Sequence, residues 1–197
     1  MKIITISGLD GSGKSTQIEL LKNHLEAQGQ KVFYFHAIAF GLANKISGLG
    51  HSERSEESRQ KKSVTQANLF QIILRRMFLM IDLLRFRFLL RKLRKNGFDY
   101  LISDRYFYDS VINIKYLAKS EKRLPCERFI IAPDKAIYLK TSPENIMSHE
   151  RKPEQGLEYL QDKEKLYDEM AKKYSLKIIN GNSDRNLIFE EIKKYVP

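Results

Sequence analysis

The sequence predicts an α/β fold in which one parallel β-sheet carries helices on both faces. Short apolar runs, rich in β-branched and aromatic residues, alternate along the chain with longer segments whose apolar residues recur at helical spacing. This alternation is typical of β-α-β units, whose crossover helices cover a parallel sheet. The length of 197 residues and the hydrophobic share of 42% suit one domain with a full core. We therefore predict a single domain over residues 1–197.

Each expected strand is a short apolar run bounded by polar residues or glycine. The expected strands cover residues 3–6, 32–35, 100–102, 136–139 and 176–179. The first helix is expected over residues 16–28, because Ile18, Leu21 and Leu25 share one helical face and Gly29 follows. The same spacing rule predicts further helices over residues 65–95, 110–119, 143–149, 160–173 and 186–195.

The segment between the first strand and the first helix fits the phosphate-binding pattern G-x-x-x-x-G-K-[ST] at Gly8, Gly13, Lys14 and Ser15. The glycines at positions 8, 11 and 13 let the backbone wrap closely around a phosphate, so that its N–H groups can donate to the phosphate oxygens. The positive end of the following helix points to the same place. Lys14 is expected to reach the β- and γ-phosphates, and the Ser15 hydroxyl is expected to bind Mg²⁺. The sequence therefore predicts a site for a nucleotide triphosphate.

The net charge of +11 favours anionic partners. A basic surface around a phosphate pocket explains this charge. The arginines within residues 65–95 suit a helix that lies beside bound phosphates. Nucleic acid is therefore not the favoured partner. No apolar run reaches the roughly 18 residues of a membrane span, and no membrane partner is expected. The early first strand leaves no room for a signal peptide, and Cys126 is the single cysteine, so we expect a cytoplasmic protein.

Two further segments stand out from the alternating pattern. Residues 51–63 contain no apolar residue, which predicts a mobile loop over about residues 48–64. Asp104 and Arg105 follow the third strand directly, at the edge where open α/β sheets bind ligands. An aspartate there can hold Mg²⁺ or its water shell, and an arginine can clamp a second phosphate with two parallel hydrogen bonds.

With these residues in order, the chain resembles the thymidylate kinase family of nucleoside monophosphate kinases. The resemblance rests on residues 8–17, on Asp104, Arg105 and Tyr106 with Ser110, and on residues 133–144 around the fourth strand. It implies a three-layer phosphate-binding-loop fold with sheet order 2-3-1-4-5 and a small lid over about residues 148–158. It also implies transfer of the ATP γ-phosphate to a nucleoside monophosphate with Mg²⁺, with dTMP as the expected acceptor, and it suggests a homodimer.

The resemblance also implies roles for individual residues. The expected catalytic residues are Lys14, Asp104, Arg105 and the lid residue Arg151, and the expected Mg²⁺ ligands are Ser15 and Asp104. The expected ATP-binding residues are Gly8, Asp10, Gly11, Ser12, Gly13, Lys14, Ser15, Thr16 and Asn182. The expected acceptor-binding residues are Asp10 for the sugar, Phe78 for the base, Arg105 for the phosphate, and Ser110.

The chain departs from the family at residues that read the acceptor. The family's Arg-Glu-Pro-Gly-Gly after the second strand is replaced by the segment that begins with His36, and Asp82 stands where an arginine reads thymine. The family's tyrosine and glutamine after Ser110 are replaced near Asn113 and Ile114. Some family members carry a catalytic arginine at the position of Gly11, and Arg151 of the lid is the expected substitute here.

Other functions stay open at this point. A deoxynucleoside kinase, or another kinase of small molecules, needs a base for its hydroxyl acceptor, usually a carboxylate near the end of the second strand, and the first carboxylate after Phe35 is Glu53. A non-catalytic ATP-binding relative would keep the phosphate loop without turnover. A GTPase is not favoured, because the segment around Lys45 lacks an aspartate to read guanine.

Overall fold

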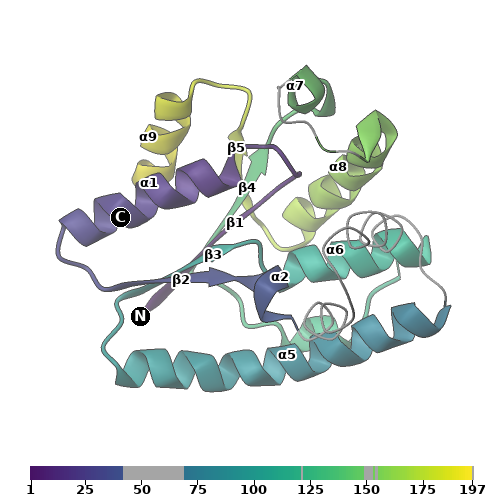
Figure 1. Ribbon diagram of the computed structural model, residues 1–197, viewed down its shortest axis with the longest axis horizontal. Helices are drawn as coiled ribbons and strands as arrows, with labels where there is room; N and C mark the ends of the chain where they lie inside the picture. Colours follow the sequence, from purple (N-terminus) through teal and green to yellow (C-terminus); the bar gives the residue numbers. More distant parts are fainter. Residues whose placement is uncertain (42–68, 121, 149–152, 154, 197) are drawn as a thin grey trace, which may run out of the picture.

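The computed structural model describes residues 1–41, 69–120, 122–148, 153 and 155–196. These residues form one five-stranded sheet that lies between two layers of helices (Figure 1). The strand order is β2-β3-β1-β4-β5 and every neighbouring pair is parallel, which confirms the predicted topology.

The strands lie where the apolar runs predict them, with ends that shift by one or two residues. They are β1 (Lys2–Ser7), β2 (Val32–His36), β3 (Tyr100–Asp104), β4 (Lys135–Lys140) and β5 (Lys177–Asn180). The inner strand β3, which lies between β2 and β1, is buried along its whole length, as expected for a strand that is covered on both faces. The register sets His36 opposite Asp104, so the carboxyl ends of β2 and β3 meet at one edge of the sheet.

The helices also follow the predicted periodicity. They are α1 (Lys14–Ala27), α2 (Ala37–Phe40), α5 (Leu69–Lys95), α6 (Phe107–Ala118), α7 (Pro143–Ser148), α8 (Gly156–Lys173) and α9 (Arg185–Tyr195), with a 3₁₀ turn, η1 (Pro125–Phe129). Helix α8 begins four residues before the expected start at residue 160, and α6 begins three residues before residue 110. The single turns α2 and η1 are too short for periodicity to indicate them.

Two separate cores hold the layers together. On one face of the sheet, α1 and α9 bury side chains such as Ile18, Leu21 and Ile188 against β1, β3 and β4. On the other face, α5, α6 and α8 form a larger core (Figure 1). No helix in the described part of the chain is long and apolar enough to cross a bilayer.

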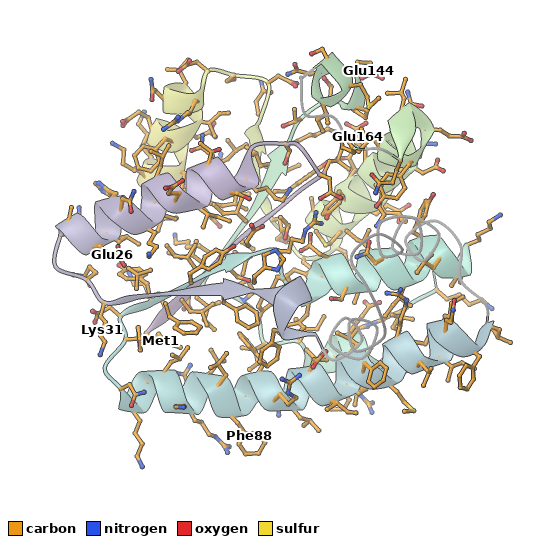
Figure 2. All side chains as sticks on the ribbon, viewed as in Figure 1. Met1, Glu26, Lys31, Phe88, Glu144 and Glu164 are labelled. Atoms are coloured by element: carbon orange, nitrogen blue, oxygen red, sulfur yellow. The ribbon has the colours of Figure 1, made fainter. Side chains whose placement is uncertain are left out.

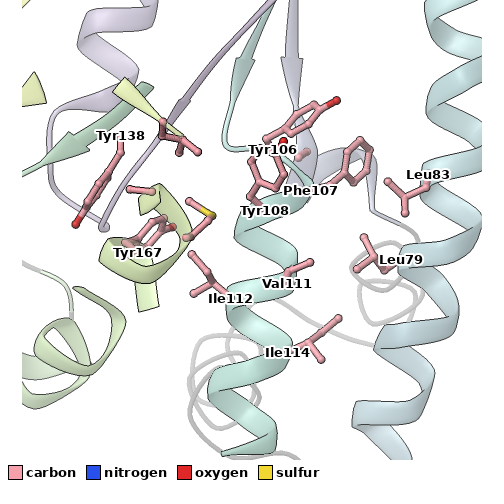
Figure 3. Packing of buried hydrophobic residues seen from close by; sticks show 14 of the residues in the cluster. Leu79, Leu83, Tyr106, Phe107, Tyr108, Val111, Ile112, Ile114, Tyr138 and Tyr167 are labelled. Atoms are coloured by element: carbon pink, nitrogen blue, oxygen red, sulfur yellow. The ribbon is translucent and has the colours of Figure 1, made fainter. Parts of the chain in front are cut away.

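Aromatic rings fill the larger core beside the functional edge of the sheet. Phe86 of α5 lies 5.0 Å from Phe35 and 5.0 Å from Phe107 between ring centroids. Tyr167 of α8 stacks on Tyr138 of β4 with centroids 5.4 Å apart, and Figure 3 shows this pair beside α6. These ring contacts fix α6 and α8 against the end of β3, where Asp104 and Arg105 lie.

Candidate active site

The loop between β1 and α1 has three positions whose backbone conformation only glycine adopts without strain. Gly8 has φ +153°, and a Cβ atom there would lie 2.6 Å from the carbonyl oxygen of Leu139. Gly11 and Gly13 have φ +84° and +86°, in the left-handed region. The loop leads directly into the N-terminus of α1, where free N–H groups and the helix dipole favour a bound anion.

Lys14 begins α1 and is buried beside the loop. Its Nζ donates hydrogen bonds to the carbonyl oxygen of Leu9 at 2.5 Å and to the Ser12 hydroxyl at 3.5 Å. Burial and the nearby Arg105 guanidinium lower the pKa of Lys14 from 10.5 to about 8. A nucleotide phosphate beside Lys14 would favour the charged ammonium form, so this lysine is suited to bind phosphate.

Ser15 and Asp104 come together although 89 positions separate them in the sequence. The Ser15 hydroxyl donates to Asp104 Oδ2 at 3.1 Å, and the Tyr34 hydroxyl donates to the same oxygen at 3.3 Å. Hydroxyl and carboxylate oxygens are the ligands that Mg²⁺ prefers, usually with waters and substrate phosphates completing its shell. The donor set therefore fits Mg²⁺, and the predicted pair Ser15 and Asp104 is the one that would hold it.

Arg105 lies directly after β3 in a left-handed conformation with φ 61°. Its guanidinium forms an ion pair with Asp10, donates to the Tyr167 hydroxyl at 3.3 Å and lies 3.8 Å from Asp109 Oδ1. Burial alone would lower the pKa of Arg105, but Tyr167, Asp10 and Asp109 outweigh burial and raise it. Arg105 is therefore a fixed cation beside the phosphate loop.

Asp109 organises this cluster, and the sequence reasoning missed it. Its side chain is 1% exposed and accepts hydrogen bonds from the Ser7 hydroxyl (2.7 Å), the Tyr106 backbone N–H (2.7 Å) and the Tyr167 hydroxyl (2.5 Å). These donors come from β1, from the start of α6 and from α8. The position of Asp109, four residues after Arg105 in the first turn of a helix, was the available signal, because acidic residues cap such turns.

These residues surround a pocket of about 440 Å³. The lining residues are Asp10, Gly11, Gly13, Lys14, Ser15, Thr16, His36, Asp104 and Arg105. Most of the predicted donor-side and phosphate residues thus line one cavity. His36, which the departure from the family pattern had marked, lies among them at the end of β2.

Gly8 and Ser12 belong to the loop without lining the pocket, and the remaining predicted site residues lie on other elements. Asn182 follows β5, and its Oδ1 accepts from the Ser142 N–H (3.1 Å) and from Asn145 Nδ2 (2.9 Å), so it joins the loops after β4 and β5. Phe78 lies half-buried on α5, and Ser110 lies in α6. Arg151 falls outside the described residues, as do residues 48–64, so the predicted lid arginine and mobile loop stay predictions.

A family model for thymidylate kinase matches residues 6–192 of this chain. The chain belongs to the thymidylate kinase family. A thymidylate kinase of Campylobacter hominis is 29% identical over 202 residues, which cover 98% of this chain and 99% of that protein. Family membership makes this chain a kinase that uses ATP as phosphoryl donor.

Solved thymidylate kinases share the fold. The enzyme of Ehrlichia chaffeensis superposes with a TM-score of 0.61 at 18% identity, covering 100% of this chain and 98% of that one. The enzyme of Candida albicans gives 0.61 at 17% identity, covering 98% and 89%. At these identities the likeness concerns the fold alone.

Two departures from the family pattern have a structural explanation. Asp82, at the place expected for a base-reading arginine, is buried on α5 and accepts from Arg85 Nη1 at 2.6 Å. A Cβ atom on Gly11 would lie 2.8 Å from Ile146 Cγ2 of α7, and Gly11 has φ +84°, so an arginine at this position would strain the backbone and displace Ile146. The observed packing of the loop against α7 therefore favours glycine at position 11.

Proposed function

We propose that this protein transfers the γ-phosphoryl group of ATP to a nucleoside monophosphate, with dTMP as the acceptor that its family implies. The observation that carries the proposal is that the phosphate loop, the Ser15–Asp104 pair and Arg105 all line the same pocket. The first two features suit an Mg²⁺-bound triphosphate, and Arg105 suits the phosphate of a second substrate.

The chemistry needs positioning and charge neutralisation more than proton transfer. An acceptor phosphate is ionised near neutral pH, so its oxygen attacks the γ-phosphorus without a general base while ADP leaves. In this proposal Lys14 would bind the β- and γ-phosphates, Ser15 and Asp104 would hold Mg²⁺, and Arg105 would orient the acceptor phosphate. Mg²⁺ would offset charge on the phosphates of ATP, and Arg151 of the lid is the proposed clamp on the transferred group.

A hydroxyl acceptor fits this site less well. The carboxylate base that a nucleoside kinase usually has near the end of the second strand is missing, because residues 32–41 contain no aspartate or glutamate. A panel of nucleosides and nucleoside monophosphates with labelled ATP tests the choice, and Lys14→Ala serves as the inactive control. Turnover of dTMP supports the proposal. Phosphorylation of nucleosides alone, or ATP binding without turnover of any monophosphate, would refute it.

We also propose a homodimer that forms through α5. Apolar side chains of this helix stay exposed at spacings of three and four residues, which is typical of a helix-pairing seam. They are Phe70, Ile73, Met77, Ile81, Leu84 and Phe88. Figure 2 shows Phe88 pointing away from the rest of the molecule. Sedimentation of the wild type and of Ile81→Glu tests this proposal: a monomeric wild type, or an Ile81→Glu variant that still forms the dimer, would contradict it.

A reducing compartment suits the single cysteine. Cys126 is a buried free thiol, and burial raises its pKa, which keeps the thiol protonated and inert. We therefore propose a cytoplasmic location, where the nucleotide substrates are also present. Fractionation of cells that carry a tagged chain tests this proposal.

A further inference from the structure

Lys163 of α8 is a buried cation that the proposed mechanism does not use. Its side chain lies within the molecule at 4% exposure. Its Nζ donates a hydrogen bond to the amide oxygen of Asn113 on α6, and it lies 5.2 Å and 5.4 Å from the ring centroids of Tyr116 and Tyr159. The charged form of a lysine that is buried this way loses its hydration, which has a considerable cost in free energy.

The amide of Asn113 and the rings of Tyr116 and Tyr159, which contact the Lys163 ammonium group, are all uncharged. Among the described residues, no carboxylate forms an ion pair with Lys163, although most buried lysines have such a partner. Asn113 lies near the place where the resemblance expects a tyrosine, so the lysine–asparagine contact involves a part of α6 that departs from the family pattern. A buried amine whose direct contacts are all neutral is suited to an anion that arrives from outside the protein.

Lys163 lies on α8 near the residue that contacts Arg105. It lies one helical turn before Tyr167 on the same face of α8, and Tyr167 accepts a hydrogen bond from Arg105 at 3.3 Å. Burial, and next the charge of Arg105, lower the pKa of Lys163 to about 7, while Asp10 and Asp109 act in the opposite direction. The residues proposed for the acceptor phosphate and sugar are therefore near enough to influence Lys163.

We propose that Lys163 is a second cation of the acceptor-phosphate site and acts together with Arg105 on the phosphate of the nucleoside monophosphate. This inference rests on the proposed function. A phosphate monoester carries close to two negative charges at neutral pH. Arg105 is already matched by Asp10 and Asp109, so it cannot balance that dianion alone. Lys163 supplies the additional positive charge from α8.

The test compares two lysines of the same helix. Lys163→Met removes the buried charge and keeps most of the side-chain volume. Lys165→Met removes a charge that is 76% exposed and pairs with Asp162, so it is the matched control. We expect Lys163→Met to raise the KM for dTMP by about 10- to 100-fold, the usual effect of losing one charged hydrogen bond, and to leave the KM for ATP within about twofold. Lys165→Met should change neither value.

Thymidine has the sugar and base of dTMP but no phosphate, so comparing the two ligands shows which part of the acceptor Lys163 contacts. If Lys163 acts on the phosphate, Lys163→Met weakens binding of dTMP and leaves inhibition by thymidine unchanged. Equal losses for dTMP and thymidine would show that Lys163 acts on the sugar or base, and no loss for either would show that it has a structural role; both results overturn the proposal. An inactive wild type would instead refute the proposed function.

Proton uptake gives a readout that needs no variant. Bound phosphate should stabilise the charged form of Lys163, so dTMP binding at pH 8 with saturating ADP should take up a proton, while thymidine binding should not. Calorimetry in two buffers of different ionisation enthalpy measures this uptake. Within the described part of the chain, the ionisable groups around Lys163 are Arg105, Asp10, Asp109, Arg75 and the hydroxyls of Tyr116, Tyr159 and Tyr167. Uptake that Lys163→Met leaves unchanged, or no uptake by the wild type, would overturn the proposal.

Discussion

Asp109 should be among the most sensitive positions of the protein, because its carboxylate joins three elements of the fold. Asp109→Ala removes the acceptor for the Ser7 hydroxyl, the Tyr106 N–H and the Tyr167 hydroxyl, all of which lie in the interior. Asp109→Asn keeps the shape and one oxygen but removes the charge. The two substitutions thus separate the loss of hydrogen bonds from the loss of charge.

The expected magnitudes follow from the number of donors left without a partner. Each buried donor without an acceptor costs about 1–3 kcal/mol, and the two hydroxyls can partly reorient, so Asp109→Ala should lower the free energy of unfolding by about 4 kcal/mol. Asp109→Asn should cost about 1–2 kcal/mol, since the hydroxyls can rotate to accept from the new amide. For a chain of this size, the larger loss corresponds to roughly 8–16 °C in Tm.

Urea unfolding followed by far-UV circular dichroism measures both values, because the chain has no tryptophan to report by fluorescence. Asp162→Ala is the control, since its carboxylate forms only an exposed pair with Lys165 and should cost about 0.5 kcal/mol or less. An Asp109→Ala variant within about 1 kcal/mol of the wild type would refute the reasoning. So would an Asp109→Asn variant that is as unstable as Asp109→Ala.

Four further predictions concern the loop, the pH dependence and the dimer. Lys14→Ala should abolish phosphoryl transfer in a coupled ADP-release assay while the fold persists; near-normal rates would contradict the role of Lys14. Gly8→Ala should raise the KM for ATP by at least about tenfold, because the new Cβ meets a backbone carbonyl oxygen at 2.6 Å. The pKa values of Lys14 and Lys163 fall from 10.5 to about 8 and about 7 on folding, so the unfolded chain holds more protons and stability should rise between pH 7 and pH 9 in denaturant titrations. The exposed charges of α5 are all basic, so the proposed dimer should tighten with rising salt concentration in sedimentation experiments; weaker association at high salt would contradict this interface.

The parts of the molecule that could be predicted are those with local sequence signals. The glycine-rich loop needs particular φ values that few residues adopt, so its pattern at Gly8 and Gly13 is specific. The buried strands are short apolar runs, and the long helix α5 has many turns in which periodicity can show. The place of Asp104 and Arg105 at the pocket could be predicted because a charged pair directly after a buried parallel strand lies at the edge where such sheets bind ligands.

The missed features depend on residues that are distant in the sequence. Asp109 acquires its role from Ser7 and Tyr167, which lie on other elements. Lys163 reads as one of several lysines on an amphipathic helix, and only the packing of α8 on α6 shows that it is buried. The early start of α8 was missed because residues 148–158 were assigned to the lid that the family resemblance implies, whereas α8 begins at Gly156.

The contact between Gly11 and Ile146 constrains the order in which mutations can accumulate. An arginine at position 11 would be blocked while Ile146 fills the adjoining space, because the first side-chain carbon would already lie 2.8 Å from Ile146 Cγ2. A smaller residue at position 146 would therefore have to appear first, although it would leave a cavity in a fully buried part of α7 and lower stability in the meantime. Neither substitution is favourable alone, so a descendant of this protein would tend to keep glycine at position 11.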